Sequence, residues 1–186
     1  MRETTLLWML ILSAAGFAQT TEAPVFGTAE RVVERLLYPE TFDVVDWDGD
    51  GDFDVLAAGS GNNRLALFEG NAQGGYDWMQ LFPEYTMADD WNDFRAVDWN
   101  GDGLVDLVAC EEGGLVWLER QADGSLSMPM LLRSGDNPIR MAIADINADG
   151  VLDVAYCDDG ANEAVLLLGT GSGEVSELEL EPLNGA

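Results

Sequence analysis

From about residue 42 onward, the chain alternates short apolar runs with polar turns rich in Gly, Asn and Asp. The runs FDVLAA, LALFE and YDWMQLF are rich in Val, Leu and aromatic residues, and turns such as GSGNN and GNAQGG bound them, which is typical of β-strands. Helix-like spacing is confined to TAERVVERLLYPE, where Val32, Val33, Leu36 and Leu37 are the apolar residues. A strand fits that segment equally well and is slightly favoured, because the segment directly precedes a strand-like run.

The pattern repeats along the chain. The stretches DWDGDGDFDVL, DWNGDGLVDLV and DINADGVLDVA begin at Asp46, Asp98 and Asp145, which are 52 and then 47 residues apart. Three strand-like segments follow each stretch, and a large apolar residue lies four positions before it. Four short strands in each repeat of about 50 residues predict the blade of a β-propeller. The large apolar residues are Phe42, Phe94 and Met141.

The predicted fold class is therefore all-β: a β-propeller-like array of three four-stranded blades, partial or open. Closed propellers have about four to eight blades, so three do not close by themselves. A fragment of a longer parent chain with further blades, self-association and an open stack stay open as alternatives. The predicted organisation is a signal peptide over 1–18, a lead-in with one strand or short helix over 19–41, and three repeats over 42–186, at about 42–93, 94–140 and 141–186.

Each repeat begins with an acidic loop whose positions we count from its first aspartate. Oxygen-bearing side chains stand at positions 1, 3, 5 and 9, and position 6 is always glycine. This alternation predicts Ca²⁺, a hard cation that takes about six to eight oxygen ligands. Position 7 varies freely, as expected of a residue that contributes only its backbone carbonyl. The predicted metal-site residues are Asp46, Asp48, Asp50, Asp52 and Asp54; Asp98, Asn100, Asp102, Leu104 and Asp106; and Asp145, Asn147, Asp149, Val151 and Asp153.

An EF-hand shares this spacing, but it needs a bidentate Glu at position 12 and flanking helices. Position 12 is Ala57, Ala109 or Tyr156 here, and both flanks predict strands. The motif D-x-[DN]-x-D-G-x-x-D before an apolar strand instead resembles the FG-GAP/VCBS repeats of integrin-type β-propellers, over roughly residues 30 to 186. The resemblance implies an ion in the hairpin loop between the first and second strands of each blade. Ala148 departs from glycine at position 4.

The composition narrows the function. The formal net charge of −27 excludes nucleic acid as a partner, because phosphate binding needs clustered cations. The chain has no His and no Lys, so His-based triads and Schiff-base lysines are excluded. Arg2, the apolar run from Leu6 and the small residues Gly16 and Ala18 predict a cleaved signal peptide and a secreted or periplasmic protein. That run is too short to span a membrane, and no membrane insertion is expected.

Tryptophans and cysteines offer further candidates. Trp47 and Trp99 stand at position 2 of their loops, where packing is favoured over sugar stacking. The segment FPEYTMADDWNDF is the least repetitive part, and a binding surface there competes with an ordinary acidic loop. Cys110 and Cys157 are equivalent positions on adjacent blades, too far apart for a disulfide, so we expect buried free thiols. The candidates in and beside that segment are Trp78, Asp89, Asp90, Trp91 and Asp93.

These patterns predict a secreted, calcium-binding, non-catalytic propeller-type module. Its partner would be an extracellular protein or a glycan, or the module would scaffold a larger protein. The ion is expected to fix the hairpin rather than to act as a sensor. The competing interpretation is a fragment or accessory module of a secreted enzyme that acts on polysaccharides.

Overall fold

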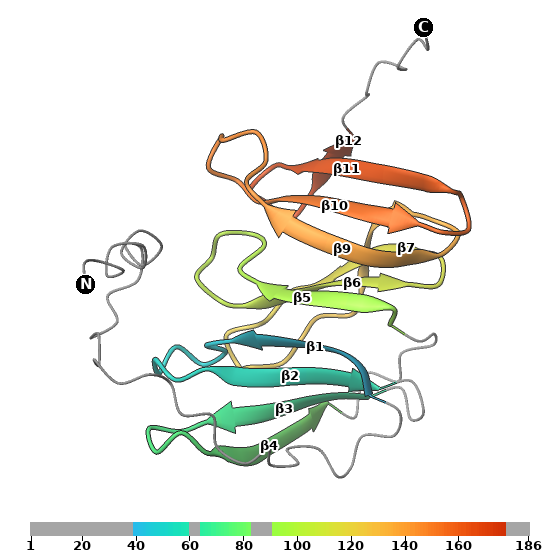
Figure 1. The fold of residues 1–186 in the computed structure, drawn as a ribbon. Helices are drawn as coiled ribbons and strands as arrows, with labels where there is room; N and C mark the ends of the chain where they lie inside the picture. The colour runs from blue at the N-terminus through green and yellow to red at the C-terminus, as the bar shows by residue number, and fades with distance from the viewer. Residues whose placement is uncertain (1–38, 60–63, 83–90, 178–186) are drawn as a thin grey trace, which may run out of the picture. The chain divides into compact units, whose positions relative to one another are not determined.

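A computed structural model describes residues 39–59, 64–82 and 91–177. In these ranges the chain is all-β, with three four-stranded antiparallel sheets and no helix (Figure 1). The three sheets do not close into a ring, so the predicted partial β-propeller is confirmed. Among the described residues there is no helix long and apolar enough to cross a membrane. The predicted signal peptide and the segment TAERVVERLLYPE up to residue 38 lie outside the described residues.

Each sheet is one blade, built from four strands that follow one another in the chain and pair in that order. Blade 1 contains β1 (Pro39–Val45), β2 (Asp54–Gly59), β3 (Arg64–Gly70) and β4 (Tyr76–Phe82). Blade 2 contains β5 (Asp93–Val97), β6 (Asp106–Glu111), β7 (Gly114–Leu118) and β8 (Met130–Ser134). Blade 3 contains β9 (Pro138–Ala144), β10 (Asp153–Asp158), β11 (Glu163–Gly169) and β12 (Val175–Glu177).

The blades pack on one another through apolar faces. Side chains alternate between the two faces of a strand, and in β6 Leu107 and Ala109 face blade 1 whereas Val108 and Cys110 face blade 3. We call the side of a blade toward the preceding blade its N-face and the side toward the following blade its C-face. Both faces of the middle blade are apolar because both are covered, so its strands β6 and β7 are buried almost throughout.

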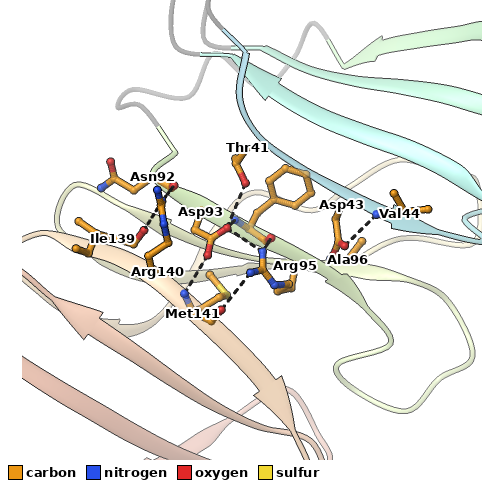
Figure 2. Close-up of polar contacts among 11 residues, drawn as sticks. Thr41, Asp43, Val44, Asn92, Asp93, Arg95, Ala96, Ile139, Arg140 and Met141 are labelled. Atoms are coloured by element: carbon orange, nitrogen blue, oxygen red, sulfur yellow. Dashed lines mark hydrogen bonds and ion pairs between the residues drawn. The ribbon is translucent and has the colours of Figure 1, made fainter. Parts of the chain in front are cut away.

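Polar contacts join the first strands of the three blades, β1, β5 and β9 (Figure 2). The buried carboxylate of Asp93 on β5 accepts a hydrogen bond from Thr41 Oγ1 at 3.1 Å and one from the backbone N–H of Met141 at 3.0 Å. Arg95 donates to Asp93 Oδ1 at 2.8 Å and to the carbonyl oxygen of Met141 at 3.2 Å. Because a buried carboxylate left unpaired is costly, these bonds fix the register between neighbouring blades.

The same contacts correct one sequence-based candidate. The sequence offers Trp91 and Asp93 as candidates for a binding surface, but both side chains are buried, with Trp91 packed beside Phe94 in the core between blades 1 and 2. Asp93 holds the blades together instead of facing solvent. The side chain of Trp78 and the residues Asp89 and Asp90 lie outside the described part of the chain.

Candidate metal centre

The three acidic loops connect the first and second strands of their blades, β1–β2, β5–β6 and β9–β10. This is the place that the family resemblance implied for the ion. Each loop is a hairpin connection between paired antiparallel strands, and all three leave the equivalent end of the equivalent strand (Figure 1). The geometry of the sheets therefore repeats the loop once in each blade.

The loops share one backbone conformation. The carboxylate at position 1 accepts the N–H of the glycine at position 6, at 3.1 Å for Asp46 and at 3.0 Å for Asp98 and for Asp145. The side chain at position 5 accepts the N–H of position 7 at 2.8 Å in every loop. Since each side-chain oxygen bonds to backbone two to five residues ahead, the chain wraps around the carboxylates and aims them inward.

Glycine is required where the loop turns most sharply. The φ angles at position 6 are 96°, 90° and 89° for Gly51, Gly103 and Gly150, a left-handed conformation that residues with a side chain rarely adopt. Position 4 is also left-handed, and in the third loop it is occupied by Ala148 at φ 61°. The departure from the family pattern thus stores a small backbone strain in loop 3.

The first loop brings its ligand atoms together. One carboxylate oxygen from each of Asp46, Asp48 and Asp50 lies within 4.8 Å of the other two. Carboxylates gathered at this spacing fit Ca²⁺, which is bound by oxygen at about 2.3–2.6 Å. In the second and third loops an asparagine stands at position 3, and its amide contacts the carboxylate at position 5: Asn100 with Asp102 at 3.2 Å, and Asn147 with Asp149 at 2.8 Å.

The aspartate at position 9 has a role that the spacing alone did not predict. Asp54, Asp106 and Asp153 are fully buried, and their oxygens accept backbone N–H groups. Asp54 accepts the backbone N–H of Trp47 at 2.7 Å and that of Gly70, the last residue of β3, at 2.8 Å. The same pair of bonds recurs in the other blades, from Trp99 and Arg120 to Asp106 and from Ile146 and Gly169 to Asp153.

Position 9 therefore clamps the loop to the end of the third strand. Burial raises the pKa of Asp106 above its usual value, opposed by the backbone N–H groups of Arg120 and Trp99. The N–H donors supply the compensation that a buried carboxylate requires.

Two glutamates beside the loops were missed by the sequence prediction. Glu69 is the last residue but one of β3, and a hydrogen bond with the Asp48 side chain, together with partial burial and neighbouring carboxylates, raises its pKa. Glu119 occupies the corresponding place after β7 and accepts from Asn100 Nδ2 at 3.2 Å. Both lie next to position 3 of their loop. The recurring sequences LFE and WLE, which end in these glutamates, are the signal in the repeats that could have indicated them.

The burial of the tryptophans at position 2 of the loops tests the prediction that they pack between blades. Trp47 and Trp99 are buried between blades, which confirms packing over sugar stacking. The indole N–H of Trp99 also donates to the carbonyl oxygen of Gly173 at 3.1 Å.

Both cysteines are free, as expected, and burial raises the pKa of the Cys110 thiol to about 12. Cys157 is exposed, which corrects the expectation that it is buried. The reason is that Cys110 faces blade 3, whereas no described blade covers the C-face of blade 3.

Repeated antiparallel blades, each with an acidic hairpin loop between its first two strands, define the class of this protein as a partial β-propeller. The family model of the FG-GAP-like repeat matches residues 46–109 and 98–156, which together exceed half of the 186 residues. The chain belongs to the FG-GAP-like repeat family. A search of curated proteins gives no significant match.

Proposed function

We propose that this chain is a secreted, calcium-binding β-propeller module that binds an extracellular protein or glycan, or scaffolds a larger protein, without catalysing a reaction. FG-GAP-like repeats form propeller modules that often bind proteins and are generally non-catalytic. The observation that carries calcium binding is the repeated loop, in which backbone N–H groups hold the carboxylates of positions 1 and 5 in the same arrangement three times.

In loop 1 the ion would be held by the side chains of Asp46, Asp48 and Asp50 and by the backbone carbonyl of Asp52. In the other loops the corresponding residues are Asp98, Asn100, Asp102 and Leu104, and Asp145, Asn147, Asp149 and Val151. The position 9 aspartates complete the predicted set of ligands through lone pairs that the backbone N–H groups leave available. The ion neutralises part of a dense negative charge and stabilises the hairpin by binding the folded state.

Secretion is supported by the basic and apolar N-terminal segment that ends in small residues. A non-catalytic role is supported by the absence of His and Lys from the sequence, which leaves Arg, Tyr and carboxylates for proton transfer. A ligand-binding module of this kind needs a rigid scaffold, and calcium-filled loops supply rigidity at one end of every blade.

Calcium binding is tested by thermal unfolding in calcium and in EDTA. At free calcium about 100-fold above the dissociation constant, each filled site contributes ~2.7 kcal/mol. We therefore expect the melting temperature to rise by at least ~5 °C for a chain of this length. An unchanged midpoint would contradict the assignment.

The matched variants Asp50→Ala and Asp52→Ala remove the same charge from the same loop. Calorimetric titration should show that Asp50→Ala weakens calcium binding at loop 1 by at least ~10-fold, since a carboxylate ligand is lost, whereas Asp52→Ala keeps its backbone carbonyl and binds nearly normally. Equal effects of the two changes would count against the loop geometry. Depolymerisation of acidic polysaccharides by the purified chain would overturn the non-catalytic role.

A further inference from the structure

The two outer blades expose apolar residues at positions that are buried or partly buried in the other blades. The large residue four positions before each loop lies on the N-face of its blade: Phe94 packs against blade 1 and Met141 against blade 2, with 0% and 6% of their surface exposed. The equivalent residue of blade 1, Phe42, is 68% exposed. No described blade precedes it.

Two more N-face positions follow the same rule. At position 8 of the loop, Val105 packs into the core between blades 1 and 2 and Leu152 into the core between blades 2 and 3, but the equivalent Phe53 is 56% exposed. Two residues after Phe42 on the same strand, Val44 is also exposed. The exposed part of the blade 1 N-face therefore comprises Phe42, Val44 and Phe53, beside the small buried cluster of Ala57, Ala66 and Phe68.

The C-face of blade 3 shows the complementary exception. Position 2 of the loop is 5% exposed in Trp47 and 3% in Trp99, both packed toward the following blade, whereas Ile146 of blade 3 is 48% exposed. Cys110 and its strand partner Leu115 are buried against blade 3, but the equivalent pair in blade 3, Cys157 and Ala164, is exposed. Leu166 lies on the same face, opposite Ala155.

We propose that these two surfaces, the N-face of blade 1 and the C-face of blade 3, dock on each other between two copies of this chain, head to tail. The docking would repeat the relation that already holds twice inside the chain, between blades 1 and 2 and between blades 2 and 3. An interface of this heterologous kind closes into a ring when the number of copies suits the rotation. Propellers close with about four to eight blades, and two copies of the three described blades give six, which lies within that range.

Docking of the two faces does not involve calcium. It places the exposed residues of the blade 1 N-face where the equivalent residues of blades 2 and 3 insert: Phe42 of one copy would cover Cys157 and Ala164 of the other, as Met141 covers the corresponding part of blade 2. Exposed apolar clusters mark interaction surfaces. The packing between consecutive blades of one chain identifies the surface that fits them.

The test uses the full chain and three variants with the same charge change. Phe42→Arg alters the N-face, Ala164→Arg alters the C-face, and Met128→Arg alters an exposed apolar residue on neither face. Light scattering coupled to size-exclusion chromatography should give twice the chain mass for the native protein and for Met128→Arg, and the single chain mass for both face variants. Circular dichroism checks that each variant is folded.

Cys157 supplies a second readout. Its thiol should react with a maleimide at least ~10-fold more slowly in the native dimer than in Phe42→Arg, although Phe42 and Cys157 belong to opposite end blades of one chain. Cys110, buried in both proteins, is the internal control for unfolding. A native protein that stays monomeric at micromolar concentration, or a dimer that only one of the two face variants dissociates, would overturn the head-to-tail arrangement.

Discussion

Single residues in the acidic loops adopt left-handed backbone conformations. Gly51, Gly103 and Gly150 take left-handed backbone conformations at position 6, which lets the N–H of each glycine reach the carboxylate at position 1. The third loop differs from the others at position 4, where Ala148 is left-handed without being glycine. An L-residue with a Cβ pays roughly 1–2 kcal/mol there.

The variant Ala148→Gly should relieve this strain. The gain is partly offset by the greater freedom of glycine in the unfolded chain, about 0.4–1 kcal/mol, so we expect the free energy of unfolding to rise by ~0.5–1 kcal/mol. Chemical denaturation in EDTA measures the change without a contribution from calcium. The matched control, Ala142→Gly on the exposed face of β9, should lower stability instead. A loss of stability in Ala148→Gly would contradict the strain.

At the scale of the elements, the position 9 aspartates join three strands. Each one lies at the start of a second strand and bonds to the loop behind it and to the end of the third strand, as Asp54 does with Trp47 and Gly70. Because these carboxylates are buried and bonded to backbone N–H groups, they stabilise the fold with or without calcium. Measuring stability in EDTA therefore separates their structural role from their role as calcium ligands.

The variant Asp106→Ala leaves the backbone N–H groups of Trp99 and Arg120 without an acceptor. Each unsatisfied buried donor costs about 1–3 kcal/mol, so we expect the free energy of unfolding in EDTA to fall by ~2–3 kcal/mol. Asp102→Ala in the same loop removes an exposed carboxylate and should cost less than ~1 kcal/mol under the same conditions. Equal losses from the two variants would show that position 9 is not a clamp.

Packing between neighbouring blades also explains why the strands of the middle blade are the most buried. β6 and β7 are covered on both faces by neighbouring blades, whereas β9 leaves the alternate residues Arg140, Ala142 and Ala144 exposed. The alternation of strand side chains is the same in every blade, so the difference comes only from the presence or absence of a neighbour.

For the whole molecule, the large negative charge and the apolar end faces act in opposite directions. A formal net charge of −27 keeps copies apart, whereas the N-face of blade 1 and the C-face of blade 3 favour association. Solvent-exposed charges are screened within about 8 Å at physiological salt and within about 3 Å at 1 M.

Head-to-tail association should therefore strengthen with salt. We expect the dissociation constant of the dimer, measured by sedimentation velocity, to fall by at least ~10-fold between 0.05 and 0.5 M sodium chloride because repulsion is screened. Phe42→Arg should stay monomeric across the same range, which distinguishes specific docking from salting out. Dissociation on raising the salt would mean that ion pairs, rather than apolar faces, hold the copies together.

The sequence by itself determined the repeat, the strand content and the loop chemistry. Glycine at a fixed place, oxygens at fixed places and apolar runs of strand length are local requirements, and each can be satisfied and recognised within about ten residues. The hairpin position of the loops came from the family resemblance, and the strand pairing agrees with it.

Only the tertiary structure decided which side chains face another blade. Trp91 and Asp93 look like part of a polar loop in the sequence but are buried between blades, and Cys157 matches Cys110 in the repeat yet is exposed. Likewise, the donors that enclose Asp54 include Gly70, from beyond the following hairpin. Burial depends on what covers a face, and the covering blade is tens of residues away in the chain, so local pattern fixes the alternation of a strand while the neighbouring blade fixes its environment.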